Sequence, residues 1–251
     1  MKMDPIVIVL FLAIVILTLV ITYISAKRTK STGDFYTAGG GLTGWQNGLA
    51  IAGDYLSAAS FLGIAGAIAL NGFDGFFYSI GFLIAYLVVL FLVAEPLRNL
   101  GKYTLADMIN SRFDAKKVRG AAALSTITIV LFYMIAQLVG AGALIQLLFG
   151  IDYWIAVLIV GVMMTIYVLF GGMMATSWVQ ITKAVLLMAG MVIMAFIVLL
   201  QFNFNISAMF TEVKTATSHG ADYLKPGIKY DDPLGTISLM IALVLGTAGL
   251  P

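Results

Sequence analysis

The sequence predicts an all-α protein that crosses a membrane several times, and composition, apolar runs and charge placement all support this class. Of its 251 residues, 61% are hydrophobic and only 10% are charged, whereas a soluble domain carries roughly 25% charged residues. Its mean hydropathy is +1.04. The basic residues lie beside apolar runs rather than on one face, so nucleic acid is not an expected partner. We expect a single membrane domain over residues 1–251, in contact with the lipid bilayer.

The polar residues argue against an enzyme or a redox subunit. The chain has no Cys, so disulfides and thiolate metal centres are not expected. Its one His, His219, lies in a polar stretch, which disfavours a haem held by histidine within membrane helices. The apolar runs carry no paired carboxylates for acid–base chemistry. We therefore expect no catalytic residues and no cofactor.

Apolar runs of about 20 residues, the length needed to cross the hydrocarbon core, recur along the whole chain. The first run, 5–26, is followed by its basic residues and has no small-residue cleavage site, which indicates an uncleaved helix and not a signal peptide. The last run is still apolar at Pro251, so we expect the chain to be cut inside a span. The other spans are expected near 43–70, 75–100, 119–149, 153–172 and 179–202, with the last near 234–251.

The basic residues also predict the orientation, because Lys and Arg near span ends favour the cytoplasmic side. Ten of the 14 fall on alternate loops: Lys27, Arg28, Lys30, Arg98, Lys102, Arg112, Lys116, Lys117, Arg119 and Lys183. The other side has Lys2, Lys214, Lys225 and Lys229. We therefore expect the N-terminus outside, the loops 27–42, 98–119 and 171–183 in the cytoplasm, and the polar loop 203–233 outside.

The stretch GWQNGLAIAGDYLSAASFLGIAG, residues 44–66, is long enough to span the membrane, but its glycines disfavour a continuous helix. Asp54 lies in its middle, where a charged side chain costs at least about 2.5–3.5 kcal/mol and normally faces a cavity, an ion or a partner. Glu95, in contrast, falls at the end of its span. Non-helical backbone at this depth is tolerated only where it lines a cavity or is buried in protein.

A break between Gly53 and Ser57 would offer carbonyl, carboxylate and hydroxyl oxygens, with Ser60 one turn further on. Such oxygens suit a small alkali cation, as in the discontinuous helices of secondary transporters. Two simpler interpretations remain open. Gly44 and Gly48 have the spacing of a close helix–helix contact, and Asp54 could cap a helix or bond to another helix.

Weaker candidates lie on other spans. Tyr133 and Gln137 are one turn apart and would face a cavity or make an inter-helix hydrogen bond. Tyr78 and Ser79 form a similar polar pair.

Several ordered motifs resemble those of the sodium:solute symporter family. They are DFYTAGGGLT from Asp34, GKYTLAD ending at Asp107 with Arg112 beyond it, AQLVGAG from Ala136, and GGMMATSWVQ from Gly171 with Lys183 beyond it. The stretches GLAIAGDYLSAASFLG, EPLRNLGKYTLAD, YVLFGGMMATSWVQITKAVLL and the terminal GTAGLP are similar to the cation/acetate symporter branch. The resemblance covers essentially the whole chain.

The resemblance implies a leucine-transporter-type fold of two inverted five-helix repeats, of which this chain would hold the N-terminal half. Residues 5–26 would be a leading helix, 43–202 the first repeat with a broken first helix, 203–233 an external loop and 234–251 the start of the second repeat. The resemblance also implies a second helix break, within residues 246–251.

The resemblance further implies a Na⁺ site in which the backbone carbonyls of Gly53 and Leu56 are ligands, with hydroxyl ligands beyond Pro251. Some relatives carry an Asp at the position of Tyr55, one residue after Asp54. From the oxygens predicted at the break and the ligands implied by the resemblance, we expect the cation-binding residues to be Gly53, Asp54, Leu56 and Ser57.

The function implied is Na⁺-coupled symport of a small monocarboxylate such as acetate across the cytoplasmic (inner) membrane by alternating access. The substrate-binding residues expected are Tyr55, Ser60, Tyr78 and Gln137, with no membrane-embedded Lys or Arg to neutralise the anion. Na⁺, the carboxylate and the C-terminal remainder of the same protein are the expected partners. The alternative is a symporter-like sensor module of a signalling protein, which a catalytic domain further along the chain would indicate.

Overall fold

The computed structural model describes residues 5–27, 30–100, 104–113 and 116–248, and every regular element within these ranges is helical. The chain divides into two compact units. The first comprises Met1–Ser60 with Tyr133–Val192, and the second Phe61–Phe132 with Ile193–Pro251. Residues that entered the orientation and motif predictions but lie outside the described ranges are Lys2, Arg28, Gly101, Lys102, Tyr103, Gly249, Leu250 and Pro251.

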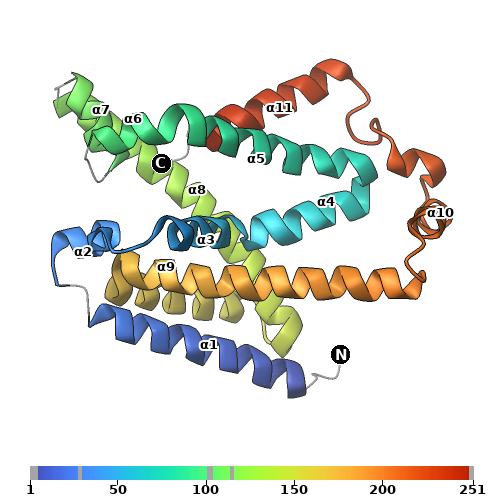
Figure 1. The fold of residues 1–251 in the computed structure, drawn as a ribbon, viewed down its shortest axis with the longest axis horizontal. Coiled ribbons are helices and arrows are strands. Elements are labelled where there is room, and N and C mark those ends of the chain that lie inside the picture. The colour runs from blue at the N-terminus through green and yellow to red at the C-terminus, as the bar shows by residue number, and fades with distance from the viewer. Residues whose placement is uncertain (1–4, 28–29, 101–103, 114–115, 249–251) are drawn as a thin grey trace. The chain divides into compact units, whose positions relative to one another are not determined.

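The first unit contains α1 (Pro5–Ala26), which covers the first expected span, and α9 (Tyr153–Gln201) up to Val192. The two helices lie side by side (Figure 1), and the hydroxyls of Thr18 and Tyr167 are 2.8 Å apart. The last part of α8 (Lys116–Phe149) also belongs to this unit, and its Phe149 packs edge-on against Phe11, with ring centroids 5.3 Å apart.

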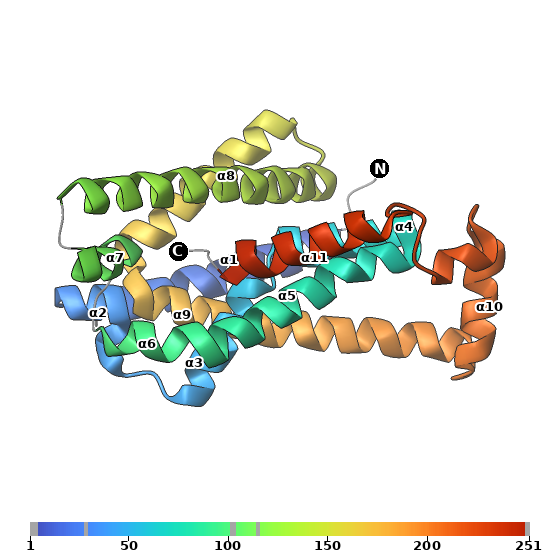
Figure 2. The same ribbon diagram turned by 90° about the horizontal axis from the view of Figure 1, so that it is seen from above.

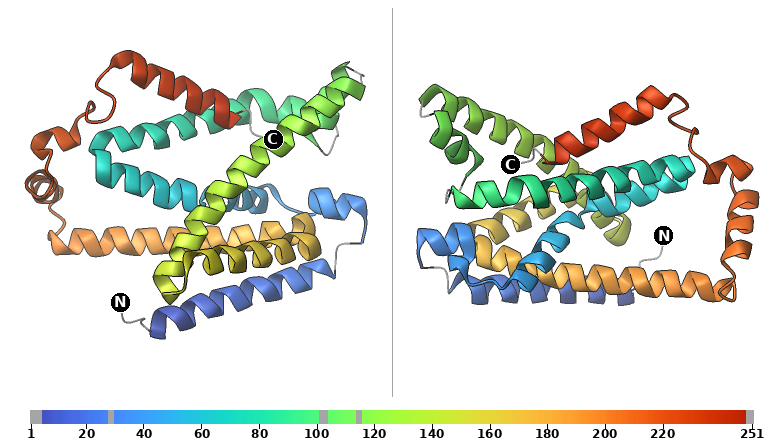
Figure 3. Two further views of the ribbon diagram at one scale, coloured as in Figure 1. Left: turned by 180° about the vertical axis from the view of Figure 1, so that it is seen from behind. Right: turned by 45° about the horizontal axis from the view of Figure 1, so that its top comes forward.

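Helix α9 is two helices joined at Gly172, where the backbone turns through φ 57°. Figure 3 shows its two arms running back along each other. They correspond to the spans expected at 153–172 and 179–202. Glycine is required at the turn because its φ is positive and because a Cβ there would lie 3.0 Å from the Phe35 ring. Phe35 belongs to α2 (Thr32–Thr37), which is followed by the short 3₁₀ turn η1 (Ala38–Gly40).

The second unit begins with a helical hairpin. Helix α4 (Ile64–Asn71) turns through η3 (Gly72–Gly75) into α5 (Phe76–Val88), and the two helices run in opposite directions (Figure 1). A π-helical stretch, η4 (Val89–Val93), then leads into α6 (Ala94–Asn99). Helix α11 (Pro233–Ala248) lies along α5 (Figures 1 and 2), and its Leu243 side chain packs on Gly81.

The polar segment 203–232 precedes α11 and contains α10 (Ile206–Ala216) and the 3₁₀ turn η5 (Gly220–Leu224). The second break expected within residues 246–251 does not fall before Ala248, where α11 is still helical, and the remaining residues lie outside the described ranges.

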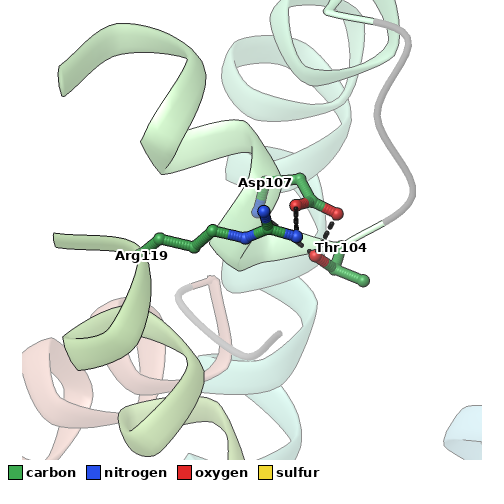
Figure 4. Close-up of polar contacts among 3 residues, drawn as sticks. All are labelled: Thr104, Asp107 and Arg119. Atoms are coloured by element: carbon green, nitrogen blue, oxygen red, sulfur yellow. Dashed lines mark hydrogen bonds and ion pairs between the residues drawn. The ribbon is translucent and has the colours of Figure 1, made fainter. Parts of the chain in front are cut away.

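A small polar cluster joins α7 (Leu105–Phe113) to the start of α8. Arg119 reaches from α8 to Asp107, with a nitrogen–oxygen distance of 2.9 Å (Figure 4). The Thr104 hydroxyl donates to the other carboxylate oxygen at 2.8 Å and accepts from the Asp107 N–H at 3.1 Å. Thr104 thereby caps the first turn of α7, and Asp107 serves both the cap and the ion pair.

The apolar side chains of these helices are largely exposed, as expected where lipid is the solvent. Within the described ranges, four helical stretches are long and apolar enough to cross a bilayer: Pro5–Ala26, Ser60–Asn99, Lys116–Phe149 and Gly171–Gln201. The second of these contains the α4–α5 turn. Two shorter apolar helices are Tyr153–Leu169 and Pro233–Ala248. The protein is therefore an all-α, multi-pass membrane protein.

Candidate cation and substrate site

The candidate site lies in the first unit, on the helix that the sequence predicts to be broken. Helix α3 (Gly44–Tyr55) begins at a capping box. The Thr43 hydroxyl accepts from the Gln46 N–H at 3.3 Å, and the Gln46 side chain accepts from the Thr43 N–H at 3.0 Å. These reciprocal bonds satisfy N–H groups that a helix start leaves free. They fix where α3 begins, and so how far it runs before the break.

The break falls at Leu56 and Ser57, between the end of α3 and a π-helical stretch, η2 (Ala58–Gly63). In an α-helix the Ser57 N–H would bond to the Gly53 carbonyl. Here it donates to the Tyr55 carbonyl at 2.7 Å and to Ser60 Oγ at 2.8 Å. The break therefore diverts the helical donor of Gly53, whose carbonyl is one of the two expected cation ligands.

The Leu56 carbonyl is the other expected ligand, and its usual helical donor is also redirected. The Ser60 N–H donates to Ser57 Oγ at 3.3 Å, and Ser60 Oγ donates to the Tyr55 carbonyl. Ser57 Oγ and Ser60 Oγ are themselves 3.3 Å apart. The two serines thus stabilise the irregular backbone by local bonds, as serine side chains do at turns, and gather several oxygens around it.

Gln137 joins this group from α8. Its Nε2 donates to Ser57 Oγ at 3.1 Å, across 80 positions of sequence. Of the two interpretations of the Tyr133 and Gln137 pair, the inter-helix hydrogen bond is therefore the one observed for Gln137. The structure brings together Ser57, Ser60, Gln137 and the backbone of Tyr55, which the sequence analysis assigned partly to cation and partly to substrate.

Tyr78, the other expected substrate residue, lies on α5 in the second unit, where its hydroxyl is 2.8 Å from that of Tyr230. The pairing of Tyr78 with the 203–232 segment had no signal in the sequence, because the two tyrosines are 152 positions apart.

Asp54 points to α9. Its carboxylate accepts from Gln180 Nε2 at 2.7 Å, so the inter-helix bond considered for it is present. The neighbouring Gly53 is buried, and a Cβ there would collide with the backbone of Gln180. Helices α3 and α9 therefore approach backbone to backbone at this point. The close contact expected at Gly44 and Gly48 is not seen, since no described atom lies within 4 Å of a Cβ at either position.

Gln180 and Lys183 are two residues near the site that the sequence analysis did not assign to it. Lys183 lies one turn beyond Gln180 on α9, is partly buried, and interacts electrostatically with Asp54. Lys183 is therefore a basic residue close to the site, whereas the expectation of no membrane-embedded Lys or Arg stays a prediction. The sequence shows that Gln180 and Lys183 are three positions apart, which places them on the same face of a helix. It does not show that this face of α9 lies against α3.

The groups at the break could coordinate a cation through neutral carbonyl and hydroxyl oxygens, and they do not form a cluster of charged ligands. In the described part of the chain, no group of three or more acidic or histidine side chains is placed to hold a metal. Carbonyl and hydroxyl oxygens with one nearby carboxylate are hard ligands that suit a weakly held monovalent cation.

A comparison with known families now identifies the chain. Residues 35–251 match the family model described as "Sodium:solute symporter family". The chain belongs to the sodium:solute symporter family. It is also 74% identical over 242 residues to a Bacillus subtilis (strain 168) protein named "Uncharacterized symporter YwcA", an alignment that covers 96% of this chain and 47% of that protein. The chain thus spans about half the length of this curated relative. No solved structure matches it.

In this chain the motif from Asp34 begins in the first turn of α2. The Asp34 carboxylate accepts from the Ser31 N–H at 2.9 Å and the Lys30 N–H at 3.1 Å, and the Ser31 hydroxyl accepts from the Asp34 N–H at 3.0 Å. The Ser31 side chain and these N–H groups lower the pKa of Asp34, because each favours the charged carboxylate. The motif therefore shapes the approach to α3 through α2, and its Phe35 packs at the Gly172 turn.

Proposed function

We propose that this chain is the N-terminal half of a Na⁺-coupled symporter that carries a small monocarboxylate such as acetate by alternating access. The family and the symporter-named relative support secondary transport. The observation that carries the proposal is the helix break at Leu56 and Ser57, where backbone and hydroxyl oxygens gather. The C-terminal remainder would complete the fold as an inverted second repeat, beginning within 234–251.

The cation would bind at the break. Its ligands in this half would be the carbonyls of Gly53 and Leu56 and the hydroxyl of Ser57, with further hydroxyls from the remainder. Asp54 would add negative potential while its Oδ1 accepts from Gln180. Of these oxygens, the Ser57 hydroxyl makes hydrogen bonds to Ser60 and Gln137. Such bonds contribute about 0.5–1.5 kcal/mol each, so an ion can replace them. Binding drives transport only if the conformations of the protein bind Na⁺ unequally.

The carboxylate would bind next to the cation. Ser60 supplies a hydroxyl donor and Gln137 an amide donor, and both side chains contact Ser57 Oγ. Tyr55 directly precedes the break in the sequence. Lys183 would attract an anion toward this region and would balance Asp54 when Na⁺ is absent. Tyr78 stays a predicted substrate-binding residue. The protein would lie in the cytoplasmic membrane with its N-terminus outside.

Uptake of labelled acetate into proteoliposomes that contain the complete protein tests this proposal. We expect an inward Na⁺ gradient to accelerate uptake by about tenfold or more, the equivalent of about 1.4 kcal/mol in activation free energy. Propionate and pyruvate serve as competitors to define the substrate class, and a K⁺ gradient of equal size is the matched control. Uptake that is equally fast without a Na⁺ gradient would refute coupling, and a lack of competition by any monocarboxylate would refute the substrate class.

A further inference from the structure

A buried carboxylate lies at the turn between α4 and α5. Asp74, in η3, is only 1% exposed, and the partners of its side chain are main-chain N–H groups. Oδ1 accepts from Gly227 at 2.9 Å, and Oδ2 accepts from Lys229 at 2.6 Å and from Tyr230 at 3.0 Å. A buried charge is costly unless it is hydrogen-bonded. An ionised carboxylate, which only accepts, is the side chain best suited to hold three converging donors.

Two further contacts bring the same stretch of chain onto the hairpin. We call residues 220–230 the latch segment. Its Tyr223 hydroxyl donates to the Ile68 carbonyl at 2.7 Å, in the last turn of α4. The hydroxyl of Tyr230 lies 2.8 Å from that of Tyr78, in the first turn of α5. The latch segment therefore contacts the end of one helix, the turn, and the start of the next.

The turn is shaped to receive the latch segment. Gly72 has φ 58°, and a Cβ at this position would collide with the backbone of Tyr223. Only glycine both adopts this conformation readily and allows such a close approach. Directly after the latch segment, α11 begins at Pro233 and packs along α5 (Figure 1). One carboxylate thus helps to hold together α4, α5 and the approach to α11.

We propose that Asp74 is a positioning residue that keeps α4, α5, the latch segment and α11 moving as one body during transport. Helix α4 follows η2 and the break in the chain, so a rearrangement at Leu56 and Ser57 is passed first to α4. Through the latch segment it is then passed to α11, the first helix after the polar segment. Packed elements held in this way shift between discrete arrangements as units. The inference rests on the proposed transport function.

The test combines hydrogen exchange and transport in the complete protein, with Asp74→Asn as the variant. An amide has one acceptor oxygen and presents N–H groups where donors converge, so it cannot serve all three N–H groups. We expect amide exchange in residues 225–230 to rise by about tenfold or more, because local opening becomes less costly. We also expect maximal uptake to fall by about tenfold, with half-saturating Na⁺ and substrate concentrations unchanged within about twofold.

Asp222→Asn is the matched control, since it makes the same Asp-to-Asn change in the latch segment, at an exposed residue whose side chain pairs with Lys225 at 3.0 Å. It should change neither readout. Unaltered exchange in Asp74→Asn would overturn the latch. Faster exchange with normal maximal uptake, or a raised half-saturation with normal maximal uptake, would overturn the positioning role.

If Asp74→Asn does not accumulate as a folded protein, Tyr223→Phe replaces it, because it removes only a hydroxyl. Its maximal uptake should fall by about threefold with the same unchanged half-saturation, and unaltered uptake would overturn the proposal. A wild-type protein without Na⁺-dependent uptake would refute the proposed function instead, while the exchange measurement would still decide whether the latch exists.

Discussion

The break at Leu56–Ser57 and the turn at Gly72–Gly75 both interrupt apolar helices, but different bonds hold them. At the break, Ser57 and Ser60 bond to backbone groups within five positions of themselves, and one bond from Gln137 comes from further away. At the turn, Asp74 binds three backbone donors more than 150 positions along the chain. Local neutral bonds are exchanged easily, whereas a buried charge with several donors is not. We infer that the break is the adaptable point and the turn the fixed one.

The largest effect is expected for Gly53→Ala, at the close approach of α3 to α9. The added Cβ meets the backbone of Gln180, which cannot rotate away, so we expect a loss of about 3 kcal/mol or more and little folded protein. Thermal stability of the purified complete protein, followed by size-exclusion chromatography, measures it.

The control for this variant is Gly48→Ala on the same helix, where a Cβ meets open space. It should be neutral or slightly stabilising, since Ala favours helix over Gly by about 1 kcal/mol. Equal stabilities of Gly53→Ala and Gly48→Ala would show that the helix break does not depend on contact between α3 and α9.

An intermediate effect is expected for Ser57→Ala, which removes the hydroxyl shared by Ser60 and Gln137. If the break is the adaptable cation site, the apparent Na⁺ affinity of uptake should fall by about tenfold, or about 1.4 kcal/mol, with modest loss of stability. Ser207→Ala, on the polar helix α10, is the control and should leave Na⁺ dependence unchanged. A Ser57→Ala protein with normal Na⁺ dependence would remove the hydroxyl from the cation site.

The smallest effect is expected for Arg119→Ala, which breaks the ion pair with Asp107. The Arg119 side chain is largely exposed, and exposed pairs contribute only about 0.2–1 kcal/mol. Thermal unfolding at low and high salt measures the loss, which should disappear at about 1 M salt because screening is then complete within a few ångströms. Lys117→Ala, an exposed change on the same turn, is the control. A loss of stability above about 1 kcal/mol that does not depend on salt would contradict this prediction. It would show that the ion pair behaves like the buried contacts of Asp74.

Much of the fold is local and was therefore predictable. The span at 5–26, the two arms on either side of Gly172 and the break near Asp54 all follow from apolar length and from glycine and polar residues within an apolar run. Helix formation and membrane partition depend on neighbours within a few turns, so the sequence carries these signals directly. The four residues from Ser31 to Asp34 likewise contain both halves of a capping box.

The partners across the chain were not predictable in the same way. Gly53 rather than Gly44 or Gly48 makes the close approach, and Asp54 accepts a hydrogen bond from Gln180. Tyr78 pairs with Tyr230 within the second unit. These choices depend on which helix faces which, and glycines or polar residues on different faces look alike in sequence.

The sequence by itself therefore determined the class of protein, its helices and the position where one of them breaks, because hydropathy, glycine content and capping act over a few residues. Only the tertiary structure decided which oxygens gather at the break and that Asp74 holds the latch segment, because a hydrogen bond between positions 150 apart forms only after the chain has packed.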